Sequence, residues 1–260
     1  MTPALGRIWL AHVRFHFAVL MREPAFWGPV VVLPAMLYVF FGAGVGAETG
    51  GGPAALQAVA AFGVYAVGSV AFFQFGVGLA HDRASVFADW AALLPRARWV
   101  GWLGQIAVTA LFCCIAVGLV LVLARLVGSH DAPARVDLTL LLACLVASVP
   151  AGLMGCLLGM LVSARSASGI AMMVYLPMAY VSGLWVPLAL LPEPVVTLSW
   201  AMPLRHMFDL VWALTHGPLQ DAIRPAVVLT LCSAALVGAL AVIGRRRRGA
   251  TGSGLHQPPR

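Results

Sequence analysis

The segment WVGWLGQIAVTALFCCIAVGLVLVLA, residues 99–124, contains no charged side chain. A helix of about 20 apolar residues is long enough to cross the hydrocarbon core of a bilayer. The chain of 260 residues has the same character throughout, with 62% hydrophobic and 10% charged residues, whereas soluble domains contain about 25% charged residues. This composition excludes an ordinary soluble domain and predicts a membrane protein.

Apolar segments of similar length recur along the chain, with short polar stretches between them. Because helices satisfy their own backbone hydrogen bonds in lipid, we predict an all-α membrane protein. Residues 1–244 are expected to form a single polytopic transmembrane domain, and residues 245–260 a basic cytoplasmic tail. The six predicted transmembrane helices lie at about 25–42, 55–80, 99–124, 138–162, 168–190 and 222–244.

Two further segments have a mixed, amphipathic character. Near the N-terminus, Leu5, Ile8, Val13 and other apolar residues recur at helical spacing beside arginines, a pattern typical of a helix that lies in the headgroup region. A frayed start of the first crossing is the alternative interpretation. Residues 191–221 are semi-apolar and interrupted by four prolines. There we expect broken outer helices, partly dipped into the membrane between spans five and six.

Arginine is distributed unevenly over the predicted loops. With the N-terminus in the cytoplasm, all but four of the sixteen basic residues fall on the cytoplasmic side, as the positive-inside rule requires. The four outer ones are Arg125, Arg135, Arg205 and Arg224. We therefore predict a multi-pass protein of the inner (cytoplasmic) cell membrane with both termini cytoplasmic. The net charge of +7 is attributed to topology and anionic lipid, with no nucleic-acid partner.

Motifs that carry chemistry are sparse. None of the basic residues is lysine, which excludes a P-loop because that motif places a lysine at the nucleotide phosphates. The predicted crossings contain almost no ionisable side chains, which argues against a proton relay. The five cysteines lie in apolar runs and indicate neither a disulfide framework nor a metal knuckle. We therefore expect no enzyme activity in this chain, no cofactor and no metal.

Three residue pairs have spacings that bring side chains together on a helix. His12 and His16 are four apart, a spacing that can place two metal ligands on one face, with no third ligand nearby in sequence. Arg205 and Asp209 are also four apart and predict a local ion pair on the outer face. The GxxxG at 155–159 allows two helices to approach closely.

Residues 81–98, HDRASVFADWAALLPRAR, form a polar island between the second and third crossings. Read as a helix, the island has one apolar face, and Asp82, Ser85 and Asp89 lie on the other side before Pro95 ends it. The apolar face consists of Val86, Phe87, Trp90, Leu93 and Leu94. Such a helix could simply cover the end of the bundle, or it could dock a partner.

Two stretches resemble the membrane subunits of the type-2 exporter class of ABC transporters. In the island, Asp82-Arg83 followed by Asp89 and Pro95 is similar to the loop of that class, although Val86-Phe87 stands where Gly-Thr is usual. In residues 176–217 the class has a proline, a Ser-Gly, an aromatic-x-Pro, a Leu-Pro and a proline before an outer helix. The matching residues are Pro177, Ser182, Gly183, Trp185, Pro187, Leu191, Pro192 and Pro203.

The resemblance implies a permease that works as a homodimer or heterodimer with a separate ABC ATPase subunit and exports an amphipathic or lipid-like compound, drugs included. A lipid-linked glycan is an alternative cargo. It implies a coupling helix to the ATPase formed by Asp82, Arg83, Phe87, Asp89, Trp90 and Pro95. It also implies an outer gate and translocation path at Pro177, Ser182, Gly183, Trp185, Pro187, Pro192 and Pro203.

A function of a different class stays open at this level. His12, His16 and His81 could serve an intramembrane enzyme or a haem-handling assembly factor. An absorption spectrum of the purified protein would distinguish that function from transport.

Overall fold

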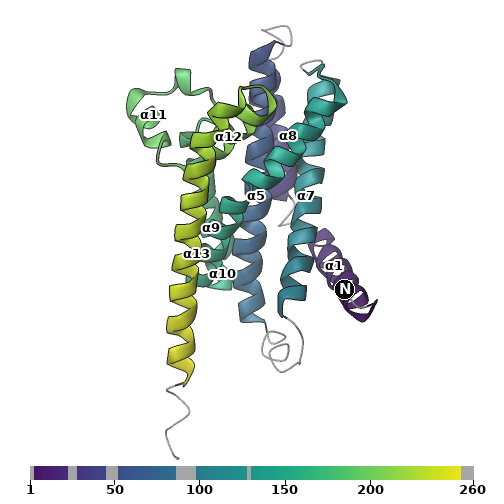
Figure 1. Ribbon diagram of the computed structural model, residues 1–260, viewed down its shortest axis with the longest axis vertical. Coiled ribbons are helices and arrows are strands. Elements are labelled where there is room, and N and C mark those ends of the chain that lie inside the picture. Colours follow the sequence, from purple (N-terminus) through teal and green to yellow (C-terminus); the bar gives the residue numbers. More distant parts are fainter. Residues whose placement is uncertain (1–2, 23–27, 45–51, 86–97, 128–129, 253–260) are drawn as a thin grey trace, which may run out of the picture.

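The computed structural model describes residues 3–22, 28–44, 52–85, 98–127 and 130–252, and every regular element within these ranges is a helix (Figure 1). The predicted all-helical fold is confirmed. The first elements are α1 (Pro3–Met21), η1 (Gly28–Val32), α3 (Leu33–Leu37), η2 (Tyr38–Gly42), α5 (Pro53–Ala84) and α7 (Arg98–Leu126). They are followed by α8 (Ala134–Ala147), α9 (Val149–Leu161), α10 (Ala164–Val181), η3 (Leu188–Leu190), α11 (Glu193–Ser199), α12 (Pro203–Thr215), η4 (Leu219–Ala222) and α13 (Ile223–Gly252).

Four stretches in the described residues are long and apolar enough to cross a membrane: Pro53–Ala84, Trp99–Leu126, Ala134–Leu161 and Leu219–Arg247. They correspond to the second, third, fourth and sixth predicted crossings. The first predicted crossing contains a shorter apolar helix, Val30–Gly42. The fifth contains α10, which ends at Val181, before the predicted end at residue 190.

The fourth and sixth predicted crossings differ in detail from the sequence-based expectation. The fourth consists of α8 and α9, which Figure 1 shows inclined to each other. Pro150 in the first turn of α9 has no N–H to continue the hydrogen-bond ladder of α8, and the helix therefore breaks at Ser148. The sixth, α13, continues through the arginine run to Gly252, so the basic segment predicted as a tail begins as helix.

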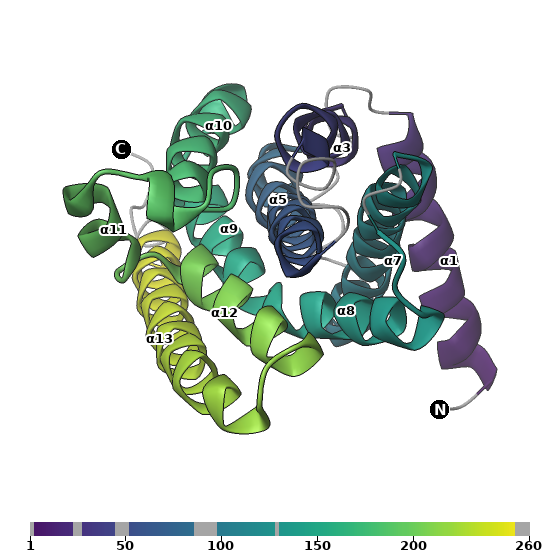
Figure 2. The ribbon, with the colours of Figure 1, turned by 90° about the horizontal axis from the view of Figure 1, so that it is seen from above.

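Helix α5 is the centre of the bundle. Figure 2, a view from above, shows it enclosed by α3, α7, α8, α9 and α10, with α13 and α1 at the periphery. In the most apolar stretch of α5, 83% of the residues are buried, compared with 6% in Leu219–Arg247. The remaining helices are thus arranged around α5, whereas α13 leaves most of its surface open to lipid or to a partner.

The GxxxG in α9 forms a close contact with α5. A Cβ atom at Gly155 would collide with the carbonyl oxygen of Phe72, and one at Gly159 would collide with the carbonyl oxygen of Gly76. A Cβ at Gly76 would in turn lie 3.3 Å from the carbonyl oxygen of Gly155. Glycine is therefore required at Gly155 and Gly159, whereas a Cβ at Gly76 would be tight, and the GxxxG joins α9 to α5 of the same chain.

The helix that contains η1, α3 and η2 has a proline in its interior. Pro34 has no N–H to donate to the carbonyl oxygen of Val30, four residues earlier. The hydroxyl of Ser69 on α5 lies 3.3 Å from that oxygen and donates to it. A neighbouring helix thus satisfies a carbonyl that the proline leaves free, as the apolar surroundings require.

We predict that Gly159→Ala destabilises the protein by about 1–3 kcal/mol, the range found for overpacked cores. The added methyl group must displace either α5 or α9, because the atom it meets is backbone. The measurement is thermal unfolding of the detergent-purified protein. The control is Gly118→Ala in α7, where a Cβ would meet nothing within 4 Å. Equal melting temperatures for the two variants would contradict the close α5–α9 contact.

Candidate functional site

The described part of the predicted coupling helix is its first turn. Asp82 and Arg83 lie in the last turn of α5 and are exposed. Phe87, Asp89, Trp90 and Pro95 lie outside the described residues. The coupling helix therefore stays a prediction, and only its junction with α5 can be examined. We call this end of the bundle the Arg83 end, and the opposite end, which carries α11 and α12, the Trp200 end (Figure 1).

Two arginines bind the C-terminal end of α9. Arg83 donates a hydrogen bond from Nη1 to the carbonyl oxygen of Gly159, and Arg247 of α13 donates from Nη2 to that of Met160. The last carbonyl groups of a helix have no partner within the helix, and the helix dipole favours cations there. Helices α5, α9 and α13 are thereby linked at the Arg83 end.

Helix α1 packs against α7 and crosses it, as Figure 2 shows. A Cβ at Gly104 in α7 would lie 3.0 Å from Cβ of His12, and the rings of Phe17 and Phe112 are 5.9 Å apart. The rings of His12 and His16 are stacked with centroids 6.3 Å apart. Among the described residues no three His, Cys, Asp or Glu side chains are grouped so that they could hold a metal ion.

At the Trp200 end, Ser182 and Gly183 terminate α10. Gly183 has a φ of +76°, and the N–H groups of Gly183 and Leu184 donate to the carbonyl oxygens of Tyr180 and Ala179. This pair of bonds is a Schellman motif, which favours glycine at the left-handed position. A Cβ at Gly183 would also lie 2.5 Å from the side chain of Leu188. The Ser-Gly pair thus ends the fifth predicted crossing and folds the chain back onto it.

The prolines predicted for the outer gate mark the starts of short helices. Pro187 precedes η3, Pro192 precedes α11, and Pro203 is in the first turn of α12. Proline is favoured at helix starts because its φ is already fixed near the helical value. It also lacks only an N–H group that would have no partner within the helix at that position. Pro177, by contrast, lies inside α10. The expected series of broken helices is present over residues 188–222.

Trp185 packs inward onto an aromatic cluster that the sequence analysis did not identify. Its ring lies edge-on to Tyr65, with centroids 5.6 Å apart. The hydroxyl of Tyr175 on α10 donates to the carbonyl oxygen of Tyr65 at 2.8 Å, a contact between residues 110 positions apart. A Cβ at Gly68 would lie 2.5 Å from that hydroxyl. A predicted gate residue is thereby in contact with the centre of α5.

The predicted ion pair between Arg205 and Asp209 is present. Arg205 Nε lies 3.1 Å and 3.0 Å from the two carboxylate oxygens of Asp209, and Arg205 Nη1 donates to Ser199 Oγ at 3.1 Å. The guanidinium group also lies over the ring of Trp200, 4.5 Å from its centroid. Arg205 therefore links α12 to the end of α11.

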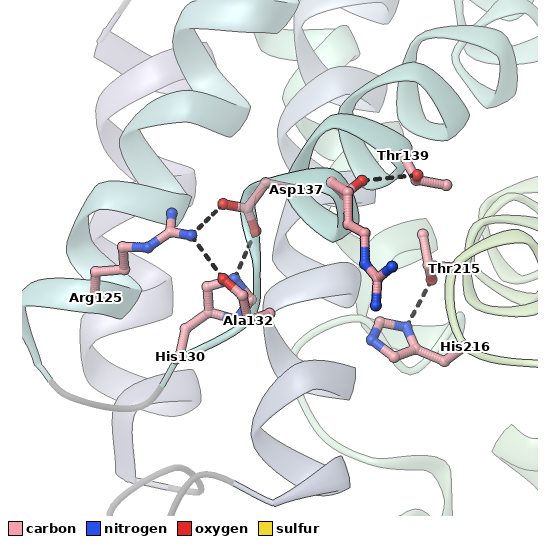
Figure 3. Close-up of polar contacts among 8 residues, drawn as sticks. Arg125, His130, Ala132, Asp137, Thr139, Thr215 and His216 are labelled. Atoms are coloured by element: carbon pink, nitrogen blue, oxygen red, sulfur yellow. Dashed lines mark hydrogen bonds and ion pairs between the residues drawn. The ribbon is translucent and has the colours of Figure 1, made fainter.

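A second ionic cluster joins α7 to α8 at the Trp200 end (Figure 3). Asp137 forms an ion pair with Arg125 and lies 2.7 Å from Nε2 of His130. Arg125 also donates to the carbonyl oxygen of Ala132 at 3.1 Å. The side chain of His130 is only 3% exposed. Asp137 is thus the anion that holds the connection between the two helices in place.

His216, at the end of α12, stacks on Trp212 with ring centroids 4.6 Å apart. Figure 3 shows its contact with the hydroxyl of Thr215, 2.7 Å from Nδ1. Burial lowers the pKa of His216, and the nearby His130 lowers it further. The neutral ring is therefore favoured, which suits a ring stacked on an indole.

We predict that Asp137→Ala lowers the free energy of unfolding by about 1–3 kcal/mol, because it leaves the buried His130 without the acceptor of its hydrogen bond. Urea or thermal unfolding in detergent measures this. Asp131→Ala, a change at an exposed position in the same connection, is the matched control. If both variants unfold like the parent protein, Asp137 does not hold the connection.

The chain was compared with known proteins. The family model described as ABC-2 type transporter matches residues 9–214, a range that runs from α1 through nearly all of α12. A search of curated proteins found no match. The matched range includes the Arg83 end, the polar island and the short helices of the Trp200 end, which are the stretches that carried the resemblance. The chain belongs to the ABC-2 type transporter family of membrane proteins.

Proposed function

We propose that this chain is the transmembrane subunit of an ABC exporter and is driven by a separate ATPase subunit. The observation that carries the proposal is the family match, which spans both ends of the bundle. The absence of lysine from the sequence supports a separate ATPase, because a P-loop cannot be formed by this chain. The ATPase binds the polar island at residues 81–98.

The Arg83 end faces the cytoplasm in this proposal. Two of the arginines predicted to be cytoplasmic lie together there at the end of α9, namely Arg83 and Arg247. Two of those predicted to be outside, Arg125 and Arg205, lie at the Trp200 end. This separation agrees with the positive-inside rule. The chain crosses the membrane six times, with Val30–Gly42 and α10 as the two shorter crossings, and it works as a dimer.

Coupling begins at the junction of the island with α5. When ATP closes the ATPase subunits, their motion displaces the island and the end of α5. Because Arg83 binds the last turn of α9 and the glycines hold α9 against α5, the two helices move as one unit. Trp185 contacts Tyr65 in that unit, so the motion reaches the short helices at the Trp200 end. Those helices form the outer gate, and the binding of ATP shifts the population between its closed and open states.

The cargo is an amphipathic or lipid-like compound. In the described residues, the buried polar side chains belong to serine, glutamine, threonine and histidine, and no Asp, Glu or Arg is buried. A path without fixed charges suits a largely apolar molecule and offers no relay for protons. Export of a drug and extrusion of a lipid-linked glycan both fit this interior.

The proposal is tested with the purified complex of the chain and its ATPase. We predict that Asp89→Lys and Trp90→Ala weaken assembly or abolish the stimulation of ATPase activity by the permease, since both residues lie in the docking element. Arg83→Gln removes the bond to the end of α9 and is expected to lower transport per ATP hydrolysed by about tenfold, within the usual range of coupling free energies.

Arg165→Gln is the matched control for Arg83→Gln. Arg165 is an exposed arginine in the first turn of α10, next to the end of α9. It should behave like the parent protein in assembly, ATPase stimulation and transport. If the three island variants also leave all three quantities unchanged, the coupling assignment is wrong.

A further inference from the structure

A pocket of about 400 Å³ lies between η3, α11 and α12 at the Trp200 end. The pocket is shallow and open to its surroundings, and its volume lies within the range of small-molecule sites. The apolar part of its lining is formed by Leu188, Ala189, Leu191 and Val196. The remaining lining residues are Trp200 and two residues of opposite charge, Glu193 and Arg205. The pocket is therefore amphipathic and carries one charge of each sign.

The guanidinium group of Arg205, the basic residue of the pocket, is held in a fixed position. The side chain of Arg205 is 13% exposed, its Nε binds both carboxylate oxygens of Asp209, and its Nη1 binds Ser199. These contacts leave Nη2 for a ligand. A second guanidinium, that of Arg224 on α13, lies over the Trp200 ring at 4.6 Å from its centroid. Arg224 does not line the pocket, but the two guanidinium groups on this indole outnumber the Asp209 carboxylate and favour an anion such as a phosphate beside Arg205.

The carboxylate of Glu193, the acidic residue of the pocket, has no partner within the described residues. Glu193 is exposed at the start of α11, and no ion pair or hydrogen bond to its carboxylate is found in that part of the chain. A carboxylate without an ion-pair partner in the described residues can bind a cationic group such as a primary ammonium. The pocket thus offers separate positions for a phosphate and an ammonium.

The surroundings of the pocket indicate that it faces lipid. Large apolar side chains next to it are exposed: Leu190 is 75%, Leu198 51% and Trp200 44% exposed. Figure 2 shows α11 at the edge of the bundle, away from α5. Tryptophan beside arginine is typical of the interface between hydrocarbon and headgroups. A ligand with acyl chains can reach this pocket sideways from the bilayer.

We propose that this pocket binds one outer-leaflet phospholipid with a zwitterionic phosphoethanolamine headgroup. The phosphate lies at Arg205, the ammonium at Glu193, and the first carbons of the chains lie against Leu188, Leu191 and Val196. Charge complementarity at two points, in a pocket beside the bilayer, selects this class of lipid over an anionic one. The site lies on the short helices of the proposed outer gate and is separate from the proposed docking of the ATPase.

Native mass spectrometry of the full-length chain in detergent tests the proposal. The protein is incubated with equal amounts of phosphatidylethanolamine and phosphatidylglycerol that carry the same acyl chains. The parent protein should retain phosphatidylethanolamine in preference. Glu193→Gln should lower the retention of phosphatidylethanolamine by about tenfold, the effect of one lost charged contact, and leave phosphatidylglycerol unchanged. Melting temperatures show that each variant is folded.

Ala189→Trp and Leu190→Trp form a matched pair. Ala189 lines the pocket, whereas its neighbour Leu190 does not line it and is exposed. Filling the pocket through Ala189→Trp should abolish retention of both lipids, and Leu190→Trp should retain them like the parent protein. Equal retention of both lipids by the parent protein, or no difference between these two variants, overturns the proposal.

Competition with soluble glycerophosphoethanolamine distinguishes a site that binds the whole lipid from a site that binds the headgroup alone. The soluble compound has the same charges but no acyl chains, and it should not displace the lipid at equal concentration. Displacement would overturn the assignment to lipid. Because these measurements require neither the ATPase nor transport, a negative result leaves the proposed transport function standing.

Discussion

The structure depends on the contact between the backbones of α5 and α9. Between helices in a bilayer the hydrophobic effect is weak, so association relies on close packing and on interhelical hydrogen bonds. Gly155 and Gly159 of α9 meet Phe72 and Gly76 of α5 with no room for a Cβ at either glycine. This approach brings the end of α9 within reach of Arg83, and Arg247 then attaches α13 to the same end.

Backbone carbonyl groups connect the other helices to this pair. Ser69 of α5 donates to the carbonyl that Pro34 leaves free, and Tyr175 of α10 donates to the carbonyl of Tyr65. In each case a polar side chain contacts backbone inside an otherwise apolar core. Without these bonds the carbonyl of Val30 and the hydroxyl of Tyr175 would be left without these partners, and an unsatisfied polar group costs several kcal/mol, roughly, in a hydrocarbon environment. These bonds therefore fix how η1 and α10 sit on α5. The contact of Trp185 with Tyr65 connects α5 to the short helices of the Trp200 end.

The all-helical class and four of the six predicted crossings could be predicted from the sequence, because long uninterrupted apolar runs are sufficient to identify such helices. The sequence predicted the series of short helices in 188–222 because prolines mark their starts. It could not predict which helix the GxxxG contacts, since small residues occur in several crossings. The contact between Tyr175 and Tyr65 spans 110 positions and leaves no local pattern. The sequence also cannot distinguish an arginine that binds a partner protein from one that binds another helix of the same chain. Arg83, at the end of a predicted crossing, donates to the carbonyl oxygen of Gly159 in α9.

The central claim is that α5 and α9 form one unit that transmits motion from the ATPase to the outer gate. Spin labels at Gln57, exposed near the start of α5, and at Thr197, exposed on α11, report on the gate. Electron–electron double resonance on the complex with its ATPase gives the distance between them. The account predicts a different distance distribution with ATP trapped than without nucleotide. Identical distributions in the two states, in a complex that hydrolyses ATP and transports, would contradict it.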